Sequence, residues 1–291
     1  MSETSPLTFF SSERVTLYLG DAFETLCLLE SDSVDCIVTS PPYYGQRDYG
    51  VPGQIGLEEH PQTYIDRLTS VFREAQRVLK PSGSLWVNVG DTYWSGKGRP
   101  GGIDPKQKNR RFLRPQDRTG KDRWCAPKQL LLIPHRLAIA MQDDGWIVRN
   151  DNVWHKPSPM PDPAKDRSSL THEYVFHFVK RRHYYFNAAA VAIPSNGKNK
   201  SKPPASVWVI PTVPSQKRHA AVFPEQLVLL PIRATCPAGG VFLDPFCGSG
   251  TAVSAALLHG QATHAIGVDL SKDALSEAKD TLYPSLVYPG D

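Results

Sequence analysis

Residues 40–43, with the sequence Ser-Pro-Pro-Tyr, combine the residue types needed to hold a flat amine. The two prolines fix the backbone and remove two N–H donors, while their carbonyl oxygens stay available as acceptors. The Ser40 hydroxyl adds an acceptor, and the Tyr43 ring is suited to stack on an aromatic ligand. An amine that donates its N–H groups to such fixed acceptors would be oriented for nucleophilic attack. A stiff strand exit with packing aromatics is the alternative interpretation.

A second segment, residues 244–251, has the sequence Asp-Pro-Phe-Cys-Gly-Ser-Gly-Thr. A short apolar run precedes it and a helical pattern begins at Thr251, which indicates a strand-to-helix turn. Glycine permits positive φ and close approach of a ligand to the backbone, as Gly248 and Gly250 would require here. Asp269 follows Gly248 by about 20 residues, the position of an acidic residue that binds ribose hydroxyls. A βα turn whose glycines serve only packing is the alternative.

The glycine pattern argues against two phosphate-binding motifs. A P-loop ends in Gly-Lys-Ser/Thr, and no lysine follows Gly250. The dinucleotide fingerprint G-x-G-x-x-G, typical of nicotinamide dehydrogenases, is not completed after Gly248. A nucleoside ligand without phosphates therefore fits the turn better.

Strands and helices must bring these two segments together. The alternation of strand and helix patterns predicts an α/β fold with a doubly wound, mostly parallel sheet, and 291 residues suit a single domain, 1–291. Ligands collect at the carboxyl ends of such strands, so we expect the two segments to meet there. We predict strands over residues 15–19, 34–39, 85–89, 148–153, 175–179, 207–210, 241–243 and 265–268. We predict helices over residues 62–79, 129–143, 225–234, 251–259 and 271–282.

Positive charge is concentrated in two parts of the chain. The net charge is +4, but residues 96–128 alone hold eleven Lys or Arg and three Asp, a net of +8. A second basic stretch, residues 180–202, contains no acidic residue. Basic loops on a slightly acidic body favour contact with a polyanion such as nucleic acid. A solvated loop is the alternative for any such charge run.

The composition argues against a membrane span and a metal site. No apolar run approaches about 18 residues, and residues 1–5 do not resemble a signal peptide. The five cysteines form no C-x-x-C pair, which favours buried free thiols in a reducing cytosol. We expect no metal ligands and no membrane partner.

The two motifs together resemble those of the S-adenosylmethionine-dependent DNA amino-methyltransferases, which methylate cytosine N4 or adenine N6. Their order, with Ser-Pro-Pro-Tyr before the glycine turn, is similar to the beta class of that family, a circularly permuted arrangement. The resemblance implies a Rossmann-like methyltransferase fold, S-adenosylmethionine as cofactor and double-stranded DNA as partner. It covers nearly all of the chain except residues 95–128 and 195–206. Further similar segments are residues 20–22, 145–149, 154–157, 172–180, 185–186 and 219–230.

The resemblance also implies roles for individual residues. The expected catalytic residues are Ser40, Pro41, Pro42 and Tyr43. The expected cofactor-binding residues are Asp21, Phe223, Asp244, Phe246, Gly248, Gly250, Thr251 and Asp269. The expected DNA-binding residues are Arg47, Arg110, Arg111, Arg114, Lys156, Arg181 and Arg182. Of these, Arg110, Arg111 and Arg114 are expected from the charge of residues 96–128, which lie outside the resemblance. The candidate segments for target recognition are residues 95–128 and 181–215.

Within the resembling family, Ser at the first position of the loop goes mostly with N4-cytosine, and Asp or Asn mostly with N6-adenine. Ser40 therefore favours cytosine, with N6-adenine as the alternative. An RNA or protein amine methyltransferase would not need two long basic insertions. A non-catalytic DNA-binding module would not need the glycine turn and Asp269. Cytosine C5 methylation needs a cysteine nucleophile, typically in a Pro-Cys pair, which the sequence lacks.

The resemblance extends to the setting in which the enzyme works. We expect a site-specific DNA methyltransferase in the cytoplasm, encoded by a bacterium, an archaeon or a phage. A cognate restriction endonuclease is a candidate partner. The expected oligomeric state is a monomer or a homodimer.

Overall fold

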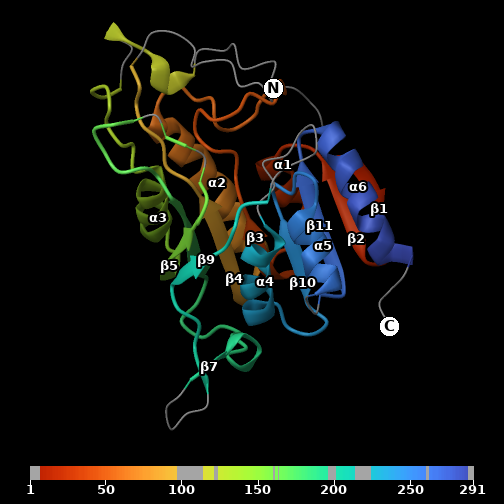
Figure 1. The fold of residues 1–291 in the computed structure, drawn as a ribbon. Helices are drawn as coiled ribbons and strands as arrows, with labels where there is room; N and C mark the ends of the chain where they lie inside the picture. Colours follow the sequence, from red (N-terminus) through yellow and green to blue (C-terminus); the bar gives the residue numbers. More distant parts are fainter. Residues whose placement is uncertain are drawn as a thin grey trace.

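The computed structural model describes residues 7–96, 114–120, 124–159, 161–162, 164–195, 201–213, 224–259 and 262–287. Within these ranges the core is a nine-stranded sheet in the order β1-β2-β11-β10-β3-β4-β6-β5-β9 (Figure 1). Its parallel centre consists of β2 (Val15–Leu19), β11 (His264–Asp269), β10 (Val241–Asp244), β3 (Val34–Thr39) and β4 (Leu79–Val89). The flanking strands are β1 (Leu7–Ser11), β6 (His172–Val179), β5 (Ile147–His155) and β9 (Val207–Val209). The predicted mostly parallel α/β sheet is thus confirmed.

Helices cover both faces of the sheet, because inward and outward side chains of the central strands are both apolar. Leu85, Val87 and Val89 of β4 pack in one core cluster, whereas the intervening Trp86 packs in the other. The first face is covered by α1 (Ala22–Leu28), α2 (Pro61–Val78) and α3 (Ile133–Asp143). The second face is covered by α4 (Glu225–Thr235), α5 (Thr251–Leu258) and α6 (Lys272–Val287) (Figure 1). The fold is therefore doubly wound, as predicted.

Strand direction decides which loops share an edge of the sheet. The parallel central strands all end at the edge where Ser40 and Asp269 lie. Strand β6 runs the other way: Tyr174 pairs with Val89 at that edge, and Val179 pairs with Ser84 at the opposite edge. The start of β6 therefore joins the candidate site, and residues 180–182 leave the sheet at its far side.

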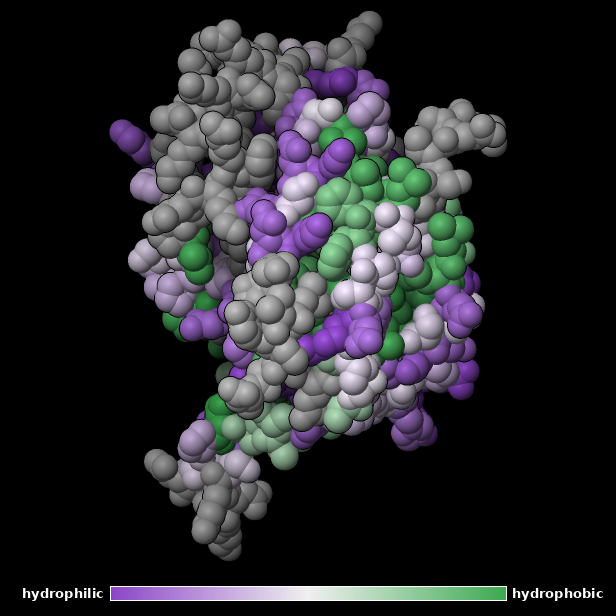
Figure 2. Space-filling view, turned by 90° about the vertical axis from the view of Figure 1, so that its right-hand side faces the viewer, coloured by the Kyte–Doolittle hydropathy of each residue, from purple (hydrophilic) through white to green (hydrophobic). Residues whose placement is uncertain are grey.

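Short elements complete the described structure. The 3-10 helix η1 (Pro115–Asp117) lies within the first basic segment, and η3 (Ala189–Val191) lies within the second. After η3, β7 (Ile193–Pro194) and β8 (Ser201–Lys202) form a two-stranded sheet that extends from the end of the molecule opposite η1 (Figure 1). Seen from the β1 and α6 side, the surface carries a broad apolar area among hydrophilic residues (Figure 2). None of the helices in the described ranges has the length and apolar character needed to cross a membrane.

Candidate active site

The glycine turn lies between β10 and α5, and Asp269 from the next strand supports it. Gly248 and Gly250 have φ values of +51° and +80°, a region that favours glycine. The Gly248 N–H donates to Asp269 Oδ2 at 2.9 Å, and the Ser271 N–H donates to Asp269 Oδ1 at 2.8 Å. Burial raises the pKa of Asp269, and these two backbone donors oppose that effect. The carboxylate is thus fixed at the end of β11, with lone pairs left to accept from a ligand.

Asp244, the last residue of β10, is buried beneath the same turn. Its Oδ1 accepts from Thr39 Oγ1 at 2.6 Å and from the Phe246 N–H at 3.0 Å. Its Oδ2 is buried without a hydrogen-bond partner in the described part of the chain. Burial raises the pKa of Asp244 to about 7. A buried carboxylate oxygen without a donor is costly unless a ligand supplies one, so this oxygen is a candidate acceptor for a ligand.

The remaining predicted cofactor residues lie in or beside this turn or fall outside the described residues. Asp21 Oδ1 caps α1, accepting from the Phe23 N–H at 2.8 Å and the Glu24 N–H at 3.2 Å. The preceding Gly20 donates its N–H to the Asp269 carbonyl at 3.1 Å, so Asp21 lies directly beside the end of β11. Phe246 is half-buried within the turn, and Thr251 begins α5. Phe223 lies outside the described residues.

The Ser-Pro-Pro-Tyr segment follows β3 at the same edge, directly after Thr39. Ser40 Oγ lies 3.4 Å from the Tyr43 hydroxyl. The Tyr64 hydroxyl of α2 donates to the Pro42 carbonyl at 2.9 Å and holds the loop against the first helical layer. No hydrogen bond reaches the Pro41 carbonyl within the described ranges, so this oxygen can still accept from a substrate.

The chain beyond Tyr43 is fixed by contacts that the sequence did not predict. The Gly45 N–H donates to the Gly56 carbonyl at 2.7 Å, and Gln116 Nε2 donates to the Gly45 carbonyl at 3.2 Å. Gln116 belongs to η1 and is fully buried, so the basic segment packs directly on the loop behind Ser40. Arg67 of α2 holds the other side of the loop through Glu58 at 2.6 Å and the Gly53 carbonyl at 2.7 Å.

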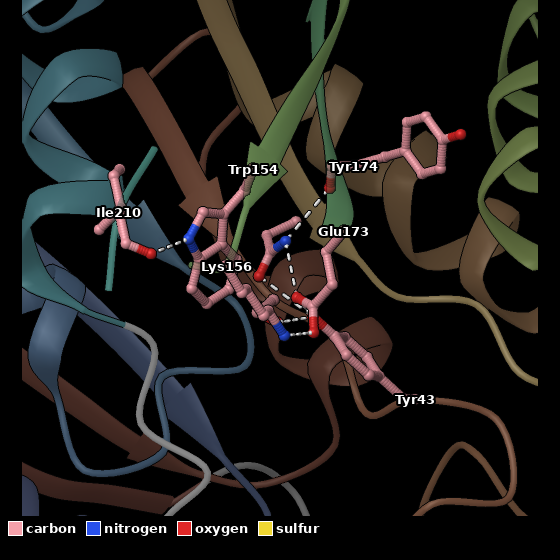
Figure 3. A network of polar contacts seen from close by, with 8 residues as sticks. Tyr43, Trp154, Lys156, Glu173, Tyr174 and Ile210 are labelled. Atoms are coloured by element: carbon pink, nitrogen blue, oxygen red, sulfur yellow. Dashed lines mark hydrogen bonds and ion pairs between the residues drawn. The ribbon is translucent and has the colours of Figure 1, made fainter. Parts of the chain in front are cut away.

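A polar network lies beside Tyr43 (Figure 3). The Tyr43 hydroxyl contacts Glu173 Oε2 at 2.7 Å and Asn88 Oδ1 at 3.1 Å. Glu173 Oε1 pairs with the Lys156 ammonium, which lies 4.4 Å above the Trp154 ring. The network joins the start of β6 to the ends of β4 and β5. A signal was present in the sequence, because charged residues beside strands as apolar as β6 need a partner or a function.

The predicted DNA-binding residues do not form one group. Arg47 is half-buried in the loop after Tyr43. Lys156 pairs with Glu173 inside the site. Arg114 donates to both carboxylate oxygens of the fully buried Asp117, at 2.9 and 3.0 Å, so its first role is to hold η1. Arg110 and Arg111 lie outside the described residues.

Arg181 and Arg182 lie apart from the other predicted DNA-binding residues. Both are exposed, but they follow β6 at the edge of the sheet opposite Ser40. The cause is the reversed direction of β6, which carries the chain away from the site. Contact of these two side chains with DNA stays a prediction.

This geometry first defines a class. A doubly wound sheet carries the glycine turn (residues 244–251) and the Ser-Pro-Pro-Tyr segment (residues 40–43) at the same edge. This is the arrangement of an S-adenosylmethionine-dependent methyltransferase.

Comparisons with known proteins then give the family. Residues 34–280 match the model of the N6/N4 DNA methylase family. The type II methyltransferase M.XycI of Xanthomonas campestris pv. cyanopsidis is 40% identical over 271 residues, covering 92% of this chain and 87% of the relative. The type II methyltransferase M.SmaI of Serratia marcescens is 40% identical over 268 residues, covering 91% and 90%. The chain belongs to this family of DNA methylases.

Solved structures share the fold. The cytosine-N4-specific PvuII DNA methyltransferase superposes with a TM-score of 0.69 at 20% identity, covering 93% of this chain and 87% of that one. A DNA modification methylase of Thermus thermophilus, complexed with S-adenosyl-L-methionine, superposes with a TM-score of 0.62 at 26% identity, covering 96% of both chains. The chain is thus a DNA amino-methyltransferase, with S-adenosylmethionine as its cofactor and DNA as its partner.

Proposed function

We propose that this enzyme methylates N4 of cytosine at a specific DNA site. The observation that carries the proposal is the position of Ser40. It directly follows Thr39, and the Thr39 hydroxyl donates a hydrogen bond to Asp244 beneath the glycine turn. The amine acceptor and the cofactor pocket are therefore adjacent through a single hydrogen bond. Ser rather than Asp or Asn at residue 40 supports cytosine as the target base.

The loop would act by orienting the target amine. An aromatic amine delocalises its lone pair into the ring, so it is a weak nucleophile unless its nitrogen becomes pyramidal. The Ser40 hydroxyl would accept one N–H and the Pro41 carbonyl the other, aiming the lone pair at the methyl donor. Tyr43 would contact the ring of the base, which must leave the duplex stack to reach the loop. S-adenosylmethionine supplies an electrophilic methyl group whose departure leaves a neutral thioether.

The cofactor would lie along the ends of β10, β11 and β2. Asp269 would accept from the ribose hydroxyls, and Asp244 Oδ2 from the ammonium group of the cofactor. Close approach to the backbone would occur at Gly248 and Gly250, where the turn has no side chains. The residues proposed to shape the rest of the pocket are Asp21, Phe223, Phe246 and Thr251.

DNA would contact the enzyme mainly through residues 95–128. Support comes from the net charge of +8 over residues 96–128 and from the packing of Gln116 against the loop behind Ser40. Arg47, Arg110 and Arg111 are the proposed phosphate or base contacts. The similarity to type II methyltransferases supports a cognate restriction endonuclease with the same recognition sequence.

The test is incubation of the enzyme with DNA and isotopically labelled S-adenosylmethionine, followed by mass analysis of the nucleosides. N4-methylcytosine carrying the label is the expected product. If N6-methyladenine carried the label instead, the target base would be adenine rather than cytosine. The proposal would be overturned if no nucleoside carried the label while a control methylase labelled its own DNA substrate under the same conditions.

A further inference from the structure

Three polar side chains contact the Tyr43 hydroxyl, and one of them is Glu173 (Figure 3). They are Ser40 Oγ at 3.4 Å, Asn88 Oδ1 at 3.1 Å and Glu173 Oε2 at 2.7 Å. A hydroxyl has one proton to donate and two lone pairs, so these contacts cannot all have the same polarity. The direction of each bond decides whether Ser40 meets the target amine as an acceptor or as a donor.

The orientation of Asn88 is fixed by its other contacts. Its Nδ2 donates to the Tyr174 carbonyl at 3.1 Å and to Glu173 Oε2 at 3.2 Å, which turns Oδ1 toward Tyr43. Tyr43 therefore faces two pure acceptors, an amide oxygen and a carboxylate. Burial, with the Glu173 charge, raises the pKa of Tyr43 well above its usual value, so the phenol keeps the proton that it donates. The shorter, charge-assisted bond is the one to Glu173.

The hydrogen bond between Ser40 and Tyr43 can then run in only one direction. Because the Tyr43 proton points at Glu173 or Asn88, a lone pair of its oxygen faces Ser40, and Ser40 donates. We propose that Glu173 is a positioning residue that sets the direction of the chain from Ser40 through Tyr43 to Glu173. Ser40 thereby presents lone pairs to the incoming amine. The inference rests on the proposed function, in which an exocyclic amine is the group that Ser40 meets.

Lys156 holds the acceptor end of this chain in place. Its ammonium pairs with Glu173 Oε1, leaving Oε2 for Tyr43, and lies 4.4 Å above the Trp154 ring. Trp154 is in turn fixed by its Nε1–H, which donates to the Ile210 carbonyl at 2.9 Å. The Lys156 and Glu173 side chains are only 19% and 14% exposed. This pairing assigns Lys156 to the catalytic loop rather than to a phosphate contact.

The experiment is a double-mutant cycle on the single-turnover rate of methyl transfer, with enzyme saturated by DNA and cofactor. In Glu173→Gln the amide oxygen would face Lys156, which only donates, so the amide NH2 would face Tyr43 and oppose the native polarity. We expect a rate loss of about tenfold or more in the wild-type background. In the Ser40→Ala background, the same substitution should change the residual rate by less than about threefold, because it acts through Ser40.

Equal rate losses in the two backgrounds would overturn the inference, because Glu173 would then act independently of Ser40. The matched control is Asp144→Asn, because the Asp144 side chain is as little exposed as that of Glu173 and is also ion-paired, to Arg73 of α2, but it follows α3 far from the site. It should leave the rate unchanged. If Glu173→Gln lowers the melting temperature, Tyr43→Phe provides the second test, with the same expected loss and the same dependence on Ser40.

The nucleoside product reports separately on the proposed function. N6-methyladenine from the wild-type enzyme would overturn the assignment to cytosine and leave the outcome of the cycle intact, because both bases present an exocyclic amine. If the product is N4-methylcytosine but the double-mutant cycle shows no coupling between Glu173 and Ser40, only the role of Glu173 is overturned.

Discussion

The Thr39 hydroxyl donates a 2.6 Å hydrogen bond to Asp244 Oδ1, and this bond joins the two motif strands, β3 and β10. The two residues are distant in sequence but lie on neighbouring parallel strands, where Phe242 pairs with Cys36 and Leu243 with Ile37. Thr39 is the residue directly before Ser40. This buried hydrogen bond therefore ties the strand that leads into the glycine turn to the strand that leads into the Ser-Pro-Pro-Tyr segment.

Asp244 should make the stability of the cofactor-free protein depend on pH. Its pKa in the folded protein is about 7, well above the value near 4 expected in the unfolded chain. Below about pH 4 both states hold the proton, and as pH rises toward 7 only the unfolded state releases it, so folding loses stability. Denaturant unfolding from pH 4 to 8 should show wild type losing up to about 4 kcal/mol relative to Asp244→Asn. Parallel pH profiles for the two proteins would contradict this expectation.

Asp269→Ala should weaken cofactor binding because it removes the carboxylate that supports the glycine turn and would accept from ribose. The expected loss is about 2–3 kcal/mol, a more than tenfold rise in Kd measured by calorimetry. Asp273→Ala is the control, since Asp273 is exposed in the first turn of α6. Unchanged affinity in a folded Asp269→Ala protein would remove this residue from the cofactor site.

Gly45→Ala should impair the loop through a steric clash. A Cβ at residue 45 would lie 1.7 Å from Gln116 Oε1, in addition to the strain of a φ of +63°. Gly50→Ala is the matched control, because Gly50 has a φ of +68° and nothing within 4 Å of an added Cβ. We expect Gly45→Ala to cost about 1–3 kcal/mol of stability beyond the control and to slow methyl transfer. Equal melting temperatures of the two variants would show that Gln116 adapts freely.

Arg114 and its basic neighbours should respond differently to alanine. Arg114→Ala leaves the buried Asp117 carboxylate without its bidentate partner, so the melting temperature should fall. Arg110→Ala and Arg111→Ala should leave the melting temperature unchanged and lower the salt dependence of DNA affinity by about one unit for each lost phosphate contact. A titration of DNA binding across a salt series, read beside thermal melting, separates the two effects. Identical salt slopes for all four proteins would shift DNA recognition away from residues 110–111.

Much of the architecture was predictable because the central strands contain apolar, often β-branched runs. Strand β4 begins at Leu79 rather than at the predicted residue 85, because Pro81 and Gly83 interrupt its apolar run. Helix α1 and strand β1 are among the elements that were missed, each for a physical reason. Helix α1 has only seven residues, so its periodicity is too short to detect, although Asp21 is a good N-cap. Strand β1 is an edge strand with little burial. The helix predicted from residue 129 begins only at Ile133, because Leu132 has a left-handed φ of 56° and Pro134 fits the first turn.

The site was predictable only where its residues follow strand ends in the parallel part of the sheet. Asp244 and Asp269 belong to that group. Glu173 does not, because it reaches the site only through the reversed direction of β6, which local sequence does not encode. The same reversal puts Arg181 and Arg182 at the edge of the sheet opposite Ser40. The contact of Gln116 with Gly45 was not predictable for another reason. Gln116 belongs to the insertion at residues 95–128, and its packing against the loop depends on shape complementarity, which has no local sequence pattern.

The sheet order has a consequence for synthesis of the protein. Strands β2 and β3 are made early but are separated in the sheet by β11 and β10, which are made last. Until those two strands insert, β2 and β3 present unpaired edges and Thr39 has no carboxylate to bind. Such long-range pairing is slow and cooperative. A growing chain should therefore depend on protection of these edges, and should gain methyl transfer only after β10 and β11 have left the ribosome.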